Sequence, residues 1–496
     1  MSRVDVLAER IKLGRLFGVA PESLGYLADL DADQLRDLRQ HLTDSLFDRT
    51  KASFQRVAAA SRLLPNGLVA LIGEKVFGAM LCARISGLLP PDRAYDIALK
   101  LPDAFLADVS VELDPRSARE VIARMPAKRV VAVAAILVAR QDYVTMGRFV
   151  DYLSRDVIRE VIESIRDDAA LLRTAFFIEN KATLNMLVGL LPIERVRRIV
   201  VLAGDDEADL WTEALGLMSH VDDDWKRKIG DIAAEQDDAV LAGLALTAQR
   251  LQLWDSVLPL VGCMSLASQQ KLARLPVLAT QEVLAAIVAT ADSQDLWGPL
   301  LPLVGHMAPD ARRAAAHIVE HLSDTTLLRL IETARAQRLW KDLVGILGDM
   351  DEAEQRNAVR LVGAQSDALL QELLEAVDGA GLWAEVLPLV TLMGPDARRT
   401  AARVVPGFPQ GVLQRLVDAA NARELWPDLV GLLVELPVAE RREVARILAA
   451  QPDALLRRLA DAIQARGLTA QLEPLVDELS DSERARLAAV MPLPGG

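Results

Sequence analysis

The chain has 496 residues, of which 51% are hydrophobic and only 4% aromatic, and its formal net charge at pH 7 is −14. Holding nucleic-acid phosphates needs a concentrated positive field, so this charge balance argues against nucleic-acid binding. Cys82 and Cys263 are too few and too scattered for a disulfide framework or a thiolate zinc site, which favours a reducing, cytoplasmic location. No uncharged run reaches the ~20 apolar residues that span a bilayer, so no transmembrane segment is expected.

Residues 1–88 follow no repeat and are predicted to be helical. Asp5 and Glu9 fall where a signal peptide needs an apolar core, which argues against secretion. Residues 30–63 are polar and amphipathic, and residues 67–89 are more apolar. Two interpretations stay open. The segment is either a cap that shields the end of a helix stack, or a docking module that binds a partner or a membrane surface through its apolar face.

Residues 89–140 carry a period of about 12, marked by prolines that each open one short predicted helix. These prolines are Pro90, Pro102, Pro115 and Pro126. Residues 89–126, LPPDRAYDIALKLPDAFLADVSVELDPRSAREVIARMP, resemble the cytosolic N-terminal helical domain of MgtE-type magnesium transporters. That resemblance implies a superhelix of short helices here. Residues 141–209 are interpreted as degenerate helical repeats.

Residues 210–496 carry a Leu-Trp pair at a fixed step of 43 residues, which is typical of stacked helical repeats. The tryptophans are Trp211, Trp254, Trp297, Trp340, Trp383 and Trp426. A seventh, truncated unit begins at Leu468, where Thr469 replaces tryptophan. An aromatic residue repeated at one position usually packs between units, so these tryptophans are expected in the core. An exposed aromatic ladder is the alternative.

Each 43-residue unit contains three stretches with helical apolar spacing, counted here from the leucine of the Leu-Trp pair as position 1. The third stretch opens with an acidic or short polar residue, which suits a helix N-terminus. Three helices in 43 residues resemble the bacterial armadillo- and HEAT-type repeat proteins. The resemblance implies an all-α fold, a right-handed α-solenoid.

Arginines recur at positions 18 and 22, four residues apart and therefore on one helical face. They are Arg313, Arg356, Arg360, Arg399, Arg403, Arg442 and Arg446. One interpretation pairs them with acids at position 37, namely Glu332, Glu375, Asp418 and Asp461. The other makes them a binding surface for an acidic peptide, a phosphorylated segment or anionic lipid head groups.

His317, Glu320 and His321 form an HxxEH string, in which two histidines on one helical face suit a zinc ion and the glutamate suits a general base. His317 occupies position 22, where other units carry arginine, and no third ligand accompanies the pair. The string is therefore interpreted as part of the polar stripe.

Together these patterns predict a non-enzymatic, cytoplasmic scaffold or adaptor without a cofactor, which binds a protein or peptide partner, in some cases acidic, on the solenoid surface. A regulator that binds membrane surfaces or polyanions through the arginines is the first alternative. A metal-dependent hydrolase using His317, Glu320 and His321 is the second. The excess of arginine over lysine favours a bacterial source.

Overall fold

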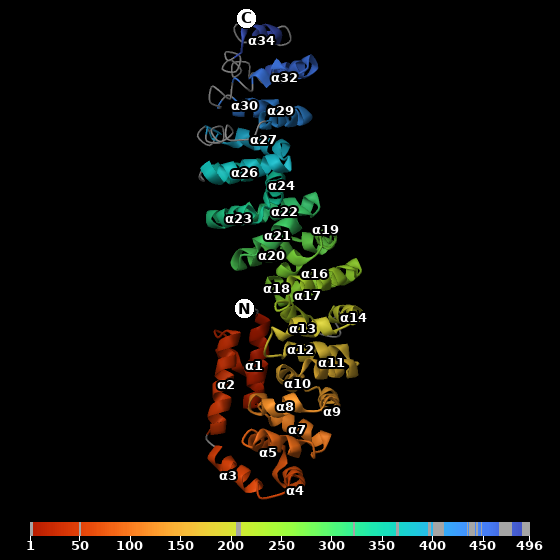
Figure 1. Ribbon diagram of the computed structural model, residues 1–496. Coiled ribbons are helices and arrows are strands. Elements are labelled where there is room, and N and C mark those ends of the chain that lie inside the picture. Colours follow the sequence, from red (N-terminus) through yellow and green to blue (C-terminus); the bar gives the residue numbers. More distant parts are fainter. Residues whose placement is uncertain are drawn as a thin grey trace. The chain divides into compact units, whose positions relative to one another are not determined.

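The computed structural model describes residues 3–48, 51–204, 210–320, 323–363, 367–394, 398–399, 411–433, 435, 442, 445–447, 449–465 and 479–488. Within these ranges every regular element is a helix and none is a strand, which confirms the predicted all-α fold. The chain divides into two compact units, residues 1–244 with 263–265 and residues 245–262 with 266–496. Figure 1 labels most of the helices of both units.

Unit 1 begins with what we call the N-terminal segment, residues 3–48, formed by α1 (Arg3–Phe17), the 3₁₀ helix η1 (Pro21–Leu27) and α2 (Ala32–Asp48). A capping box starts α2, because Asp31 Oδ1 accepts from the Gln34 amide at 2.8 Å and Gln34 Oε1 accepts from the Asp31 amide at 3.0 Å. One leucine from each element forms its apolar core: Leu13, Leu24 and Leu35.

The next four elements are short and connect the N-terminal segment to the proline-marked helices. They are α3 (Lys51–Ser61), α4 (Asn66–Ile72), the π-helical turn η2 (Gly73–Phe77) and α5 (Gly78–Ser86). A glycine is needed at the start of α5, since Gly78 has φ +76°. The inner faces of α4 and α5 pack through Ala70 and Ala83 on the helices that follow.

Each of the 12-residue stretches forms a short helix or a 3₁₀ turn that runs into one. The elements are α6 (Pro91–Ala98), α7 (Asp103–Glu112), η3 (Pro115–Ala118), α8 (Arg119–Arg124) and α9 (Ala127–Ala139). Pro102 and Pro126 occupy the N-cap positions of α7 and α9, and Pro115 is the first residue of η3. Proline fits there because the first helical amides have no intrahelical acceptor to lose.

The remaining elements of unit 1 are helices joined by short connections. The boundary between units 1 and 2 falls within the last of them, α17. These elements are α10 (Tyr143–Phe149), η4 (Val150–Tyr152), α11 (Arg155–Ser164), α12 (Asp168–Phe176), α13 (Thr183–Leu190), α14 (Ile193–Ala203), α15 (Trp211–Met218), α16 (Asp223–Ala234) and α17 (Asp238–Leu251). A Cβ on Gly147 of α10 would lie 2.8 Å from the Thr174 carbonyl oxygen of α12, so glycine allows these two backbones to approach closely.

In unit 2 the first helix of each described repeat begins at the tryptophan. The elements are α18 (Trp254–Cys263), α19 (Leu266–Ala273), η5 (Pro276–Ala279), α20 (Gln281–Gln294), α21 (Trp297–Gly305), α22 (Pro309–Glu320), α23 (Asp324–Gln337), α24 (Trp340–Asp349), α25 (Glu352–Gly363), α26 (Asp367–Ala380), α27 (Trp383–Leu392), α29 (Val412–Arg423), α30 (Trp426–Leu433), α32 (Asp453–Ala465) and α34 (Asp481–Ala488). The repeat from Leu253 has a 3₁₀ turn, η5, in addition to its three α-helices, because Pro276 starts this turn after α19.

One backbone joint recurs where a third helix meets the next tryptophan-led helix. The residue before each leucine has positive φ: Gln252, Asp295, Arg338, Gly381 and Glu424. The leucine amide then bonds back to the carbonyl five residues earlier, as from Leu296 to Ala291 at 2.9 Å and from Leu339 to Ala334 at 2.8 Å. This is the Schellman pattern, which ends a helix and turns the chain into the next one.

The tryptophans of unit 2 lie in its core. Trp254, Trp297, Trp340, Trp383 and Trp426 are each at most 5% exposed. Trp211, at the same repeat position in unit 1, is only half-buried, although the preceding Leu210 is fully buried. Burial of one large aromatic residue per repeat gives each 43-residue repeat a fixed contact with the neighbouring repeats.

Candidate functional site

The arginines at positions 18 and 22 lie on the exposed face of second helices in unit 2. We call Arg313 and His317 of α22 together with Arg356 and Arg360 of α25 the charged stripe. Their side chains are between 60% and 66% exposed. A contact between His317 Nδ1 and Glu354 Oε1 at 2.9 Å brings α22 and α25 together, so the stripe continues from one repeat to the next.

Every member of the charged stripe contacts an acid. Arg313 pairs with Asp310 and Arg356 with Glu352, each within its own helix. Arg360 reaches Asp324 of the preceding repeat at 3.3 Å. The stripe therefore presents alternating positive and negative groups instead of a continuous positive field.

Three of the four acids predicted to pair with these arginines have other partners, which corrects that prediction for Glu332, Glu375 and Asp418. Glu332 accepts from Arg335 of its own helix, and Glu375 and Asp418 accept from glutamines four residues earlier. Position 37 lies on the third helix, and its side chains are held by neighbours along that helix. The prediction relied on position alone, without the orientation of the second helix relative to the third.

The other predicted surface arginines fall partly outside the described residues. Arg399, Arg442 and Arg446 are exposed. Arg403 lies outside the described residues.

A different set of side chains links consecutive repeats along the third helices. Position 34 of one repeat pairs with position 40 of the repeat before it. The pairs are Arg329 with Asp292 at 2.6 Å, Glu372 with Arg335 at 3.3 Å and Arg415 with Asp378 at 2.7 Å. The middle pair has the charges exchanged, so opposite signs are kept. That exchange is visible in the sequence and is the signal from which these contacts could have been predicted.

The HxxEH string is only partly within the described residues, because His321 lies outside them. His317 contacts Glu354, whose second oxygen accepts from the Asp351 amide at 2.6 Å as part of a capping box at the start of α25. Among the residues that the structure describes, no three His, Cys, Asp or Glu side chains come together as a metal site.

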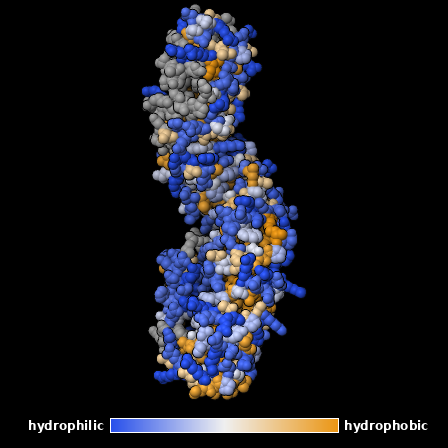
Figure 2. Space-filling view, viewed as in Figure 1, coloured by the Kyte–Doolittle hydropathy of each residue, from blue (hydrophilic) through white to orange (hydrophobic). Residues whose placement is uncertain are grey.

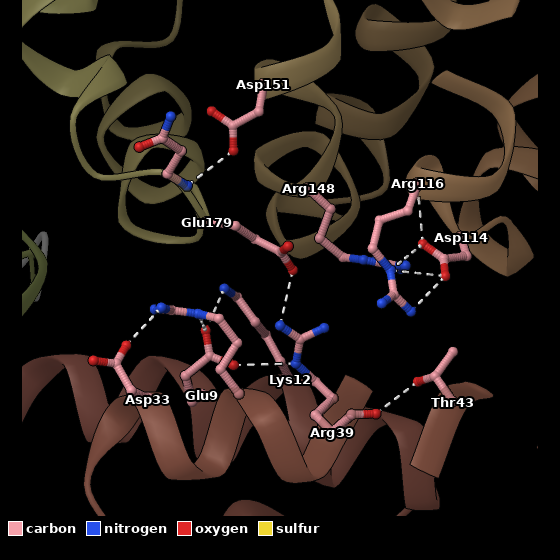
Figure 3. A network of polar contacts seen from close by, with 12 residues as sticks. Glu9, Lys12, Asp33, Arg39, Thr43, Asp114, Arg116, Arg148, Asp151 and Glu179 are labelled. Carbon is pink, nitrogen blue, oxygen red and sulfur yellow. Dashed lines mark hydrogen bonds and ion pairs between the residues drawn. The ribbon is translucent and has the colours of Figure 1, made fainter. Parts of the chain in front are cut away.

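Unit 1 contains a second charged assembly, centred on Glu9 of the N-terminal segment (Figure 3). The Glu9 side chain is 2% exposed, and its carboxylate lies 2.9 Å from Lys12 Nζ, 3.1 Å from Arg39 Nε and 3.5 Å from Arg36 Nε. Burial raises the pKa of Glu9, but the charges of Lys12 and Arg39 outweigh burial and bring its pKa below the ordinary value. Burial also lowers the pKa of Lys12.

The N-terminal segment contacts a series of loops and helix starts in the rest of unit 1. The contacts are Asp5 with His220 at 2.9 Å, Arg15 with Asp142 at 2.7 Å, Arg39 with Glu179 at 2.9 Å and Asp44 with Arg116 at 2.9 Å. Figure 3 shows Glu179 pointing from the loop after α12 toward Arg39. These partners are 72 to 215 residues apart in sequence, so they hold distant parts of unit 1 together.

This assembly was not predicted from the sequence. Asp5, Glu9 and Lys12 argue against a signal peptide, but their spacing of four and three residues also places them on one helical face. Leu13 lies beside Lys12 and is fully buried. Charges on the same side of a helix as a core leucine are the signal that the face is buried against other charges.

Lys181, in the loop before α13, makes the stability of the folded chain depend on pH. Burial lowers its pKa from 10.5 to about 8, and Nζ donates to the Phe176 carbonyl oxygen at 2.9 Å. Between pH 8 and 10.5 the unfolded chain keeps this proton and the folded chain does not, so stability rises with pH there. Below pH 8 the folded chain holds this charge in a buried place, which lowers the free energy of unfolding by on the order of 3 kcal/mol.

We therefore expect Lys181→Met to raise the free energy of unfolding at pH 7 and to remove that part of its rise with pH. Urea unfolding of the two proteins at pH 7 and at about pH 10 measures this difference. Identical pH slopes for variant and native chain would show that Lys181 keeps its ordinary pKa.

Comparisons with known proteins give no family. No protein-family model matches the chain, and no curated protein matches it. Solved structures match with low scores. Human Puf-A has 13% identity and a TM-score of 0.23 over 90% of this chain and 100% of that one. The maize pentatricopeptide repeat protein PPR10 has 12% identity and a TM-score of 0.16 over 94% and 83%. A circular tandem repeat protein has 15% identity and a TM-score of 0.15 over 96% and 97%. Scores this low carry no argument about fold or function.

Proposed function

We propose that the chain is a non-enzymatic scaffold that binds a protein partner along the second helices of unit 2, and that its 43-residue repeats form a right-handed α-solenoid of armadillo or HEAT type. The observation that carries the proposal is the charged stripe, in which exposed side chains of both signs repeat at fixed positions on α22 and α25. Such a repeated surface matches a partner that carries both charges at regular spacing.

Each member of the charged stripe is already paired with a carboxylate, and this favours a protein partner over a polyanion. Arg313, Arg356 and Arg360 already contact carboxylates, so a phosphate chain or an anionic bilayer would have to displace Asp310, Glu352 and Asp324 or lie beside them. A protein segment with acidic and basic side chains can instead extend the same alternation. We therefore favour a protein partner over nucleic acid or lipid at this surface.

Unit 1 offers an internal precedent for this kind of binding. Its helices hold the N-terminal segment through Asp5, Arg15, Arg39 and Asp44, each matched to a side chain of opposite sign or to His220. A helix array of this chain thus accepts a helical segment through ion pairs placed on successive elements. We propose that unit 2 accepts a partner in the same manner, in the cytoplasm.

The test is a pull-down from lysate of the source organism with the tagged full-length chain. In the Arg356→Glu, Arg360→Glu variant we expect recovery of a stoichiometric protein partner to fall at least about tenfold, because two contacts change sign. The matched control is Arg155→Glu, Arg159→Glu, an exposed arginine pair with the same spacing on α11. Equal losses in both variants, or recovery of nucleic acid or lipid without a protein, would contradict the proposal.

A further inference from the structure

The connection before α4, together with α4, η2 and α5, exposes several large apolar side chains. Leu63 is 87% exposed, Val76 72% and Met80 63%. Other large apolar side chains exposed over the same elements are Leu64, Leu68, Leu71 and Phe77. We call these seven side chains the apolar patch. Figure 2 shows apolar surface gathered at this end of unit 1. Exposed apolar residues concentrated in this way mark a binding surface more often than isolated ones do.

The apolar patch is not a consequence of loose packing. Ala70 of α4 and Ala83 and Ile85 of α5 are buried. Their helices pack on α6 and α7, where Leu101, Leu106 and Val109 are buried as well. Each of these two helices therefore has apolar side chains on two sides. One side packs into unit 1, and the other is exposed.

The π-helical turn η2 directs part of this surface outward. A π turn holds one more residue than an α turn, so the side chains after it are rotated relative to those before it. Val76 and Phe77 occupy this turn, and Gly78 follows with φ +76°. Leu63 lies in the connection between α3 and α4. Leu63 and Val76, the two most exposed members of the apolar patch, therefore protrude from turns.

The segment that carries the apolar patch has a net charge opposite in sign to that of the whole chain. Residues 51–88 contain five basic residues and one acidic residue, a net charge of +4, in a chain whose net charge is −14. The basic residues are Lys51, Arg56, Arg62, Lys75 and Arg84. Arg56, Arg62 and Lys75 are exposed. Exposed apolar side chains in a segment of net positive charge suit a surface that combines apolar material with negative charge.

We propose that α3, α4, η2 and α5 dock onto the surface of an anionic lipid bilayer. The protruding Leu63, Val76 and Met80 enter the boundary between head groups and acyl chains, and Arg56 and Arg62 contact the anionic head groups. Two weak signals of this kind together give stable and reversible attachment. A second copy of the chain is a poorer occupant, because it would bring one net charge of +4 against another.

Attachment of this kind leaves the chain on one side of the bilayer. The helices involved have 11, 7 and 9 residues, well short of the ~20 needed to span. Among the described residues no helix is long and apolar enough to cross a membrane. The docking surface lies in unit 1 and shares no residue with the charged stripe, so lipid and a protein partner need not compete for the same side chains.

The experiment is co-sedimentation of the full-length chain with vesicles of phosphatidylcholine alone or with about one third phosphatidylglycerol. We expect binding only to the anionic vesicles, and weaker binding at about 1 M salt than at about 0.15 M. The Arg56→Glu, Arg62→Glu variant should bind the anionic vesicles with an affinity at least about tenfold lower than that of the native chain. Arg155→Glu, Arg159→Glu carries the same change in net charge elsewhere in unit 1 and should bind like the native chain.

The apolar contribution is tested by Leu63→Ser, Val76→Ser, Met80→Ser, which should lose anionic-vesicle binding. Its matched control is Val240→Ser, Leu246→Ser, Leu266→Ser, three exposed apolar residues elsewhere. Circular dichroism confirms that each variant is folded. Equal binding to both vesicle types, equal losses in test and control variants, or a native dimer that the apolar-patch variant converts to monomer would overturn the proposal. None of these outcomes depends on the charged stripe.

Discussion

Glu9→Gln is expected to lower the free energy of unfolding of unit 1 by about 3–5 kcal/mol. The Glu9 carboxylate is buried among Lys12, Arg36 and Arg39, and its removal leaves Lys12 and Arg39 buried with one counter-charge fewer. A buried charge that loses its partner is among the most destabilising changes a single substitution makes. Urea unfolding followed by circular dichroism gives the difference.

The matched control is Glu22→Gln, which makes the same change at an exposed position in η1. It should alter stability by less than about 0.5 kcal/mol. Limited proteolysis adds a local measurement, because loss of the Glu9 contacts should expose the N-terminal segment before the rest of unit 1 unfolds. If Glu9→Gln behaves like Glu22→Gln in both measurements, the charged assembly does not hold the N-terminal segment in place.

Trp297→Ala is expected to destabilise unit 2 by about 3–5 kcal/mol. The Trp297 side chain is 1% exposed, and its helix α21 contacts α19 and α20 of the preceding repeat and α24 of the next, so truncation leaves a large cavity. Thermal unfolding should show the transition of unit 2 shifted to lower temperature. Trp211→Ala is the comparison at the same repeat position, and it should cost less because Trp211 is only half-buried.

Conservative replacements separate packing from hydrogen bonding at these tryptophans. Trp254 Nε1 donates to Gln249 Oε1 at 2.8 Å, whereas Trp297 Nε1 is buried and has no hydrogen-bond partner. Trp254→Phe should therefore cost more than Trp297→Phe, by about 1 kcal/mol, the net contribution of one hydrogen bond. An equal or larger loss at Trp297 would show that the hydrogen bond of Trp254 does not set the difference.

The parts of the fold that follow from local rules could be predicted from the sequence. Helix-forming composition and 3.6-residue periodicity gave an all-α chain, and the structure confirms it. The Leu-Trp step marks first residues of helices, because a joint with positive φ precedes each described pair from Leu253 to Leu425. Burial of Trp297 and its equivalents follows from the leucines that surround them in sequence.

Contacts between distant segments could not be predicted in this way. The partners of Glu9 and Arg39 come from α2 and from the loop at Glu179, and no periodic pattern links those positions. Sequence position alone places acids at position 37 near the arginines, but it does not give the orientation of the second helix relative to the third, and Arg360 contacts Asp324 instead. The apolar patch was foreseen only as one of two interpretations of residues 1–88. Its exposure depends on which side of α4 and α5 packs on α6 and α7.

The most direct test of the proposed scaffold is hydrogen–deuterium exchange of the full-length chain with and without its captured protein partner. The account predicts slower exchange in peptides from α22 and α25 on binding, and unchanged exchange in α11, which carries the control arginines. Protection confined to elements outside the second helices of unit 2, or no protection at all, would contradict the assignment of the charged stripe as the binding surface.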